Sequence, residues 1–217
     1  MTARDKFGEK LERHVVIHEL GHCVVGRLLG FRENGAEFFR SGSSDSGHVG
    51  FQWDQGTPAH PLLMRALAGI YSQAVIVPES VCDNMREQVI EGEFEAGLRD
   101  MIERNRFLPE IHSEGLAGDW VFIWEIGRRA GLSTDDLVIA VDRAHKALAK
   151  LFEDEGFKSM FLACEADLNT WFDTDDEERQ FDDTFTYSVA RFGPIVDQFR
   201  EGLSENDSNA PPSADSE

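Results

Sequence analysis

The chain has 217 residues, of which 41% are apolar and 10% aromatic; this composition can bury a sizeable core, which excludes wholesale disorder. Its 41 acidic side chains outnumber 21 basic ones, so the formal net charge is -20 at pH 7. Because such a surface repels phosphate groups, nucleic acid is not expected as a direct partner and anionic membrane surfaces are disfavoured.

Local patterns in the first half of the chain predict two helices and a β-hairpin. Apolar side chains cover most of a helix over 9–29, so this helix should be largely buried and end at Gly30. Two aromatic-rich runs, AEFFRS and HVGFQW, flank the turn sequence GSSDSG and predict a β-hairpin within 36–54. Two prolines then open a second helix, over 62–76, and Pro78 follows its end.

The second half of the chain is predicted to be helical as well. Residues 81–108 have an amphipathic and highly charged helical pattern, and 119–129 form another expected helix. Ser133 begins an N-cap sequence, STDD, for a helix that runs to about Phe152. The predicted fold class is therefore mainly α with a small β-hairpin or sheet.

The distribution of charged and apolar residues predicts the domain organisation. One domain is expected over residues 1–203, followed by a disordered acidic tail over 204–217, where no large apolar residue occurs. Within the domain, the stretch 165–183 carries nine acidic side chains and a single arginine. Such a run is usually a solvated face, and we favour that interpretation over a docking surface. No apolar run approaches the ~20 residues that a membrane span requires.

One motif carries recognisable chemistry. The sequence HELGH at residues 18–22 has the form HExxH and lies inside the predicted helix 9–29. Positions four apart on a helix lie one above the other, so the imidazoles of His18 and His22 can bind one metal ion. Glu19 points beside that ion, where a general base for a metal-bound water belongs. A chain of this composition contains about 0.02 such motifs by chance, so we predict a catalytic zinc site with one open position.

Three neighbours of the motif need separate interpretations. Gly21 costs about 1 kcal/mol relative to alanine in the middle of a helix, so we expect another element to pack closely there. His14 lies two turns before His22, and a rise of about 12 Å is too long for one ion to reach both, so His14 should lie outside the metal site. Cys23 is expected to be a small core residue and not a redox switch.

The cysteines and the start of the chain indicate the compartment. Cys23, Cys82 and Cys164 are widely spaced and odd in number, which fits neither a disulfide framework nor a CxxC metal knuckle. Residues 1–10 are charged and lack the apolar stretch of a secretory signal. We therefore expect a reducing, cytoplasmic setting.

At the motif, the stretch RHVVIHELGHCVVGRLLG resembles the metal-binding helix of the FtsH family of AAA-linked zinc peptidases. The matching positions are Arg13, His18, Glu19, Gly21, His22, Val25 and Gly26. More weakly, GHVGFQW is similar to the Gly-containing edge strand of that family, and LLMRALAGIYSQAVI to the helix that follows it. The resemblance covers roughly residues 9–130 and implies a zincin-like helical metallopeptidase domain.

The resemblance also implies a third zinc ligand. In the FtsH family this ligand is an aspartate in a G-x-x-x-D stretch that begins a helix, and the sequence GLAGD, ending at Asp119, matches that pattern. Its spacing from the motif is longer than usual because the charged segment 81–110 is inserted. From the residues alone, an aspartate at a helix start is more often a cap. Glu114 and Asp83 remain the alternative third ligands.

The leading interpretation is a stand-alone zinc endopeptidase for peptides or unfolded proteins. His18, His22 and Asp119 would hold the metal, and Glu19 would pass a proton to the leaving amine. The predicted edge strand, with Val49, Gly50 and Phe51 at its centre, would bind the substrate backbone by strand addition or, with equal weight, serve as a purely structural cover. The sequence contains no GxxxxGK[ST] loop, so a partner ATPase or assembly of several copies would be needed to handle folded substrates.

Two alternatives remain open. An ImmA-like regulatory peptidase also contains HELGH, although such proteins usually place a sizeable structured region before the motif, and here 17 residues precede it. A metal- or peptide-binding adaptor on the peptidase scaffold would bind without useful turnover, as the acidic stretch and the missing ATPase loop suggest. Zinc-dependent cleavage of an unfolded protein such as casein separates the adaptor from the enzymes.

Overall fold

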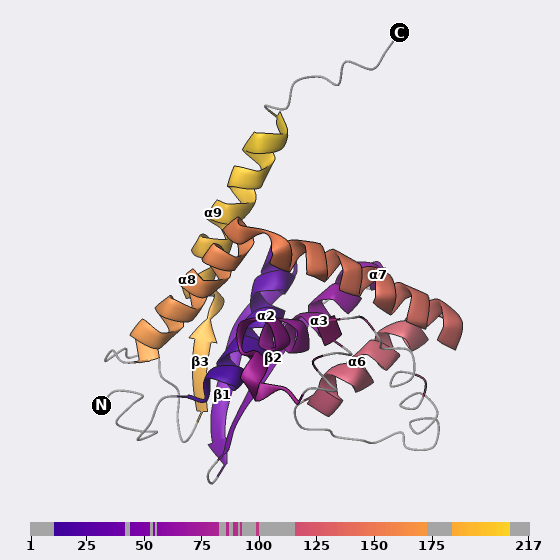
Figure 1. Ribbon diagram of the computed structural model, residues 1–217, viewed down its shortest axis with the longest axis horizontal. Helices are drawn as coiled ribbons and strands as arrows, with labels where there is room; N and C mark the ends of the chain where they lie inside the picture. Colours follow the sequence, from indigo (N-terminus) through magenta and orange to yellow (C-terminus); the bar gives the residue numbers. More distant parts are fainter. Residues whose placement is uncertain are drawn as a thin grey trace.

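The computed structural model describes residues 11–41, 44–52, 54, 56–82, 86, 89–90, 92, 99, 116–172 and 184–208. This part of the chain is mainly helical and contains a three-stranded antiparallel sheet (Figure 1). The elements are α2 (Arg13–Leu28), β1 (Arg32–Ser41), β2 (Ser44–Gln52), α3 (Ala59–Ile76), the 3₁₀ turn η1 (Pro78–Ser80), α6 (Leu116–Arg129), α7 (Thr134–Glu153), α8 (Glu155–Phe172), β3 (Thr184–Ser188) and α9 (Val189–Ser208). Among the described residues, none of the helices is both long and apolar enough to cross a membrane.

Helix α2 is the buried centre of the fold, as its apolar surface predicted. Every residue from Val16 to Gly26 is buried. Gly30 ends the helix with φ +86°, and the amide of Phe31 beyond it donates to the Gly26 carbonyl at 2.9 Å. This left-handed C-terminal turn favours glycine, so the predicted end of the helix is confirmed. The helix begins at Arg13, and residues 9 and 10 lie outside the described part.

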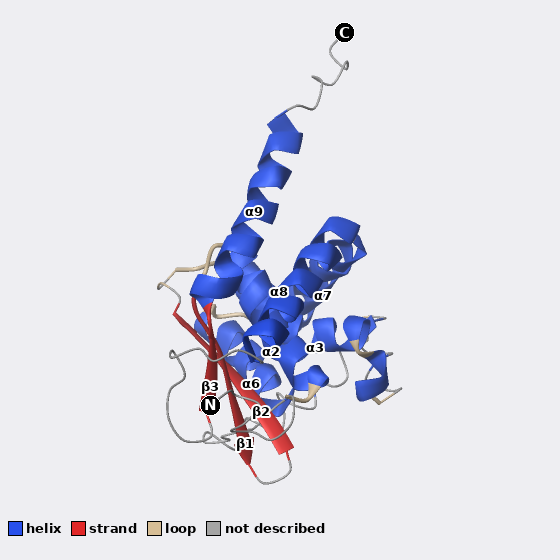
Figure 2. Ribbon diagram, turned by 90° about the vertical axis from the view of Figure 1, so that its left-hand side faces the viewer, coloured by secondary structure: helices blue, strands red, loops and turns tan. Residues whose placement is uncertain are grey.

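The predicted β-hairpin is present and is part of a larger sheet. Strands β1 and β2 pair antiparallel, and β3 pairs with the other side of β1, giving the order β2-β1-β3. Strand β2 therefore lies at the edge of the described sheet. Figure 2 shows the three strands gathered on one side of the helices, and both β1 and β2 contact α2.

Helix α3 packs closely against α2 and confirms the second predicted helix. Every residue from Leu62 to Ala74 is buried. A Cβ added at Gly21 would lie 2.3 Å from Ser72 Oγ and 2.4 Å from the Ala68 carbonyl oxygen. Ser72 Oγ also donates to the Ile17 carbonyl at 2.9 Å. The close approach that Gly21 predicted is therefore the contact with α3.

Two of the later helices were predicted and three elements were missed. Helix α6 begins at Leu116, slightly before the predicted start, and α7 begins after Ser133, whose Oγ accepts a hydrogen bond from the Asp136 amide at 3.1 Å. Helix α8, strand β3 and helix α9 were not predicted. Most of the segment 81–110, including Asp83, lies outside the described residues, as does Glu114.

The prediction of a solvated face over 165–183 is wrong for four residues in the last turns of α8, Glu165, Leu168, Trp171 and Phe172, which are buried, whereas Ala166 and Thr170 of the same turns are exposed. Glu165 is 8% exposed and pairs with Arg13 at 2.7 Å, and Trp171 and Phe172 are buried. Apolar side chains recur at helical spacing through α8, so this periodicity, and not the acidic charge, decides burial. Residues 173–183 lie outside the described part.

Helix α9 also departs from the prediction, because it continues past residue 204 to Ser208. The first residues of the segment expected to be a disordered tail are therefore helical, while 209–217 are not described. Figure 1 shows α9 projecting away from the other helices. The ion pair between Arg27 and Asp197 joins its first half to α2.

Candidate metal centre

Two helices bring the predicted ligands together. His18 and His22 project from α2, and Asp119 projects from the first turn of α6. The Nε2 atom of His18 lies 3.0 Å from Asp119 Oδ2, and the Nε2 atom of His22 lies 3.2 Å from Asp119 Oδ1. The two Nε2 atoms are 3.3 Å apart. One ligand atom from each residue thus falls within 4.8 Å of the others, a grouping that could hold a metal ion.

Asp119 does not occupy a capping position. Helix α6 begins at Leu116, so Asp119 is already inside the first turn and its carboxylate is directed to the histidines. The capping role that the sequence alone favoured therefore does not describe this side chain.

The hydrogen bond at the far side of the His22 ring fixes its tautomer. His22 Nδ1 lies 2.8 Å from the main-chain oxygen of Arg65. A carbonyl oxygen can only accept, so Nδ1 carries the hydrogen. In the neutral imidazole, Nε2 then presents a lone pair to the other members of the cluster.

The tautomer of His18 is fixed in a similar way, through the side-chain amide of Gln73. Ser80 Oγ donates to the Val77 carbonyl at 2.7 Å, so it accepts from Gln73 Nε2 at 3.2 Å. This orients the Gln73 amide with its Oε1 toward His18 Nδ1, at 3.2 Å. His18 Nδ1 is therefore the donor, and neutral His18 also presents its Nε2 lone pair to the cluster.

Three hydrogen-bond acceptors consequently converge in a buried space. The exposed fractions of His18 and His22 are 8% and 5%. Asp119 Oδ2 is buried and, among the described residues, lacks a hydrogen-bond partner, because its short contact with His18 does not have hydrogen-bond geometry. Facing lone pairs and a carboxylate repel one another unless they share a cation. Two imidazole nitrogens and a carboxylate oxygen are a donor set that fits zinc.

The charges of the cluster shift the pKa values of His18 and Asp119 in opposite directions, each toward the charged form of the group. Burial lowers the pKa of His18, but the Asp119 carboxylate beside it outweighs burial and raises the pKa to about 9. Burial would raise the pKa of Asp119, but His22 and His18 reverse this and hold it well below its usual range. In the metal-free protein the cluster therefore retains a proton, which a bound cation would replace.

Glu19 lies beside the cluster under strand β2. Its side chain is buried, and a Cβ added at Gly47 would lie 2.2 Å from Glu19 Cγ and 2.7 Å from Oε1. Burial raises the pKa of Glu19, although the neighbouring His18 opposes the shift. A carboxylate with a raised pKa takes up a proton more readily than an ordinary one, as a general base must.

Helix α3 leaves space for the two imidazoles and supplies their hydrogen-bond partners, and neither role was predicted from the sequence. A Cβ added at Gly69 would lie 2.4 Å from His22 Nε2 and 2.8 Å from His18 Nε2. Glycine at this position leaves room for both rings. The residues around the site that sequence reasoning missed are Gly47, Arg65, Gly69 and Gln73. The four-residue spacing of the last three, which puts them on one face of a helix, was the signal available.

The other predicted site residues lie in β2 or outside the cluster. Val49 is buried and Gly50 is half-buried, while the side chain of Phe51 is outside the described part. His14 pairs with Glu12 and is absent from the metal-binding group, as expected.

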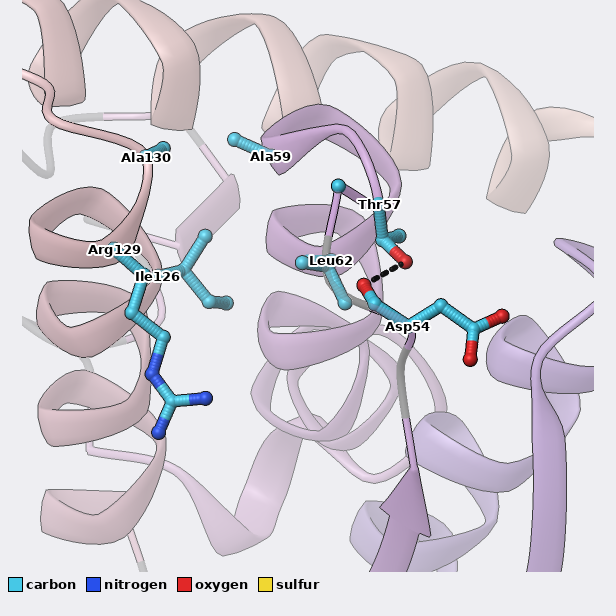
Figure 3. Close-up of a pocket in the computed structure, with 8 residues that line it drawn as sticks. Asp54, Thr57, Ala59, Leu62, Ile126, Arg129 and Ala130 are labelled. Carbon is cyan, nitrogen blue, oxygen red and sulfur yellow. Dashed lines mark hydrogen bonds between the residues drawn. The ribbon is translucent and has the colours of Figure 1, made fainter.

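A separate pocket of about 470 Å³ lies at the other end of α6 (Figure 3). It is lined by Asp54, Gly56, Thr57, Ala59, Leu62, Ile126, Arg129 and Ala130. None of the residues around the metal cluster lines it. Asp119 and Arg129 stand about 15 Å apart along the helix axis, so the pocket is not part of the metal centre.

Comparisons of the chain with family models, with curated proteins and with solved structures gave no match.

Proposed function

We propose that this protein is a zinc-dependent endopeptidase with a zincin-like, FtsH-like arrangement of its site. The observation that carries the proposal is the convergence of His18 Nε2, His22 Nε2 and an Asp119 oxygen, each buried and each an acceptor. Three protein ligands leave one position of a tetrahedral zinc ion for water or substrate, which is typical of catalytic sites.

Residues of the chain would orient the two imidazoles and balance the charge of the metal ion. When bound, zinc would supply Lewis-acid chemistry and bring the pKa of a water ligand to about 7. Gln73 and the Arg65 carbonyl hold the two imidazoles in the tautomer that leaves Nε2 unprotonated. Asp119 contributes the negative charge that offsets part of the charge of the cation.

Glu19 is proposed as the proton carrier. Its carboxylate would accept a proton from the attacking water while the water oxygen bonds to the peptide carbonyl carbon. As the carbon–nitrogen bond breaks, the same proton would pass to the leaving amine. The raised pKa of Glu19, which results first from burial, supports this role because it strengthens the base.

The proposed substrate is an extended peptide or an unfolded protein. Strand β2 lies at the edge of the described sheet, and its Gly47 contacts Glu19 directly. A peptide that adds to an edge strand by main-chain pairing would therefore lie beside the proposed base. Folded substrates would require a partner ATPase or an assembly of copies. The proposed setting is cytoplasmic, because three widely spaced cysteines do not form a disulfide framework.

Cleavage of casein by reconstituted protein tests the proposal. Wild type should degrade casein when loaded with zinc and lose this activity after chelation, while His22→Ala should be inactive at every zinc concentration. A protein that binds zinc and peptide but releases no fragments would be the adaptor, and the endopeptidase proposal would be abandoned.

A further inference from the structure

One face of helix α3 serves the metal-binding helix at successive turns. Gln73 contacts His18, and Gly69, one turn earlier, leaves room for both imidazoles. Arg65 comes one turn before Gly69 on the same face, and its carbonyl accepts the hydrogen bond from His22. Arg65 is thus the residue of this face whose side chain contacts strand β2.

The side chain of Arg65 reaches a different element from its main chain. Arg65 Nη2 donates a hydrogen bond to the Val49 carbonyl in β2, at 3.4 Å. Only 3% of Arg65 is exposed. Burying a guanidinium is costly unless it is hydrogen-bonded, and an apolar side chain could fill the position without that cost. What arginine adds here is a donor directed at the main chain of β2.

Strand β2 is consequently held to the site at two points. Gly47 packs on Glu19, and two residues later the Val49 carbonyl accepts the hydrogen bond from Arg65. A slip of one residue would bring the side chain of His48 onto Glu19, where even a Cβ would lie 2.2 Å from Cγ. Packing at Gly47 therefore rejects this one-residue slip, and the Arg65 contact anchors β2 to α3 in the register that Gly47 allows.

We propose that Arg65 is a positioning residue that holds β2 in register with the metal centre, so that an extended peptide pairs with β2 and its scissile bond lies beside Glu19. The inference rests on the proposed endopeptidase function and specifies how that site takes its substrate. Recognition is through main-chain hydrogen bonds to β2, which favours extended chains over folded ones.

Arg65→Met tests this role, with Arg65→Lys as the conservative variant and Arg128→Met as the matched control. Methionine keeps the length and removes the donor, and lysine keeps one charged donor. Arg128 is exposed and pairs with Glu125 at 2.7 Å, far from β2 in the chain. The zinc affinity of Arg65→Met should stay within about twofold of wild type, because the main-chain oxygen that holds His22 is unchanged.

Two readouts report the position of β2. The first is hydrogen exchange of the backbone amides of residues 46–50, which should accelerate about tenfold in Arg65→Met and remain unchanged in Arg128→Met. The second is binding of a fluorescein-labelled 12-residue casein peptide to the zinc-loaded protein in a Glu19→Gln background, which should weaken about tenfold. In the enzyme that retains Glu19, Arg65→Met should raise KM and also lower kcat, because the scissile bond would no longer lie beside Glu19. Arg65→Lys should recover part of both effects.

The outcomes separate this inference from the proposed function. If Arg65→Met matches Arg128→Met in exchange and peptide affinity, Arg65 only fills space and the inference is overturned. If it loses zinc, the side chain supports the metal site instead, which also overturns it. If Arg65→Met does not fold, the exchange of Arg65→Lys decides, with wild-type rates counting against the inference. Zinc-loaded wild type that neither binds nor cleaves the peptide refutes the endopeptidase, while exchange in β2 still tests the Arg65 contact.

Discussion

Asp119 Oδ2 lies 3.0 Å from His18 Nε2 without the geometry of a hydrogen bond. The two atoms belong to helices α6 and α2, and each is an acceptor when His18 is neutral. Such a contact is favourable only with a cation between or beside the two atoms. Zinc affinity and the pH dependence of stability distinguish a metal ion from a proton in that role.

Asp119→Asn should weaken zinc binding by at least about tenfold, because an amide oxygen is a poorer zinc donor than a carboxylate. The helix content should remain, since Asp119 does not cap α6. Competition with a zinc-binding dye measures the affinity, and circular dichroism serves as the control for folding. If this variant binds zinc with wild-type affinity, Asp119 is not a ligand, and Asp83 or Glu114 becomes the candidate third ligand.

The stability of the metal-free protein should fall as the pH rises from about 6.5 to about 9. The pKa of His18 is raised from its ordinary 6.5 to about 9, so its contribution is fully present below 6.5 and is lost as the pH rises through 9. The lowered pKa of Asp119 adds stability above its ordinary 3.8, which is lost only at more acidic pH. Urea unfolding in the presence of a chelator measures this slope.

Zinc should reverse that pH dependence, because protons compete with the metal for His18. With excess zinc, the midpoint of unfolding should therefore rise between pH 6 and 8. Asp119→Asn offers the control for the metal-free slope, which should become shallower without the carboxylate. An unchanged slope in Asp119→Asn would mean that another group titrates in this range.

Gly69→Ala should lower zinc affinity more than tenfold, because the added Cβ would lie 2.4 Å from His22 Nε2. Gly202→Ala is the matched control, since Gly202 is exposed in α9 and its added Cβ would meet nothing within 4 Å. That control should bind zinc normally and gain up to about 1 kcal/mol in stability. Calorimetric zinc titration of both variants checks the prediction, and equal affinities would show that the two imidazoles can move aside.

Glu19→Gln should keep zinc and lose peptide hydrolysis by about 10²- to 10⁴-fold, because an amide cannot accept the proton. Since burial raises the pKa of Glu19, its ionised form destabilises the fold above its ordinary pKa of 4.5. The variant should therefore be more stable than wild type at pH 7 in the absence of metal. Loss of zinc in Glu19→Gln would identify Glu19 as a ligand instead.

Elements with strong local signals could be predicted from the sequence. Helix α2 and the HExxH spacing depend on residues within a few turns, and the same holds for the Ser133 cap. Strand β3 was missed because five residues give little periodicity and its pairing with β1 is remote in the chain. In α8, the acidic residues predicted a solvated face, whereas the apolar residues at helical spacing bury Trp171.

The site shows the same division between local and tertiary information. His18, Glu19 and His22 follow from one helical turn of sequence, whereas Asp119 was implied only by the family resemblance. The partners on α3 became visible once packing placed α3 against α2. A residue such as Gly69 has no chemical signature of its own, because its role is to leave space for two rings.

The most direct test of the account is the zinc content of the purified protein after reconstitution and exhaustive dialysis, measured by elemental mass spectrometry beside His22→Ala. The account predicts about one zinc per wild-type chain and nearly none in His22→Ala. Wild type without bound zinc at a pH where imidazole is neutral, or equal zinc in the two proteins, would contradict it.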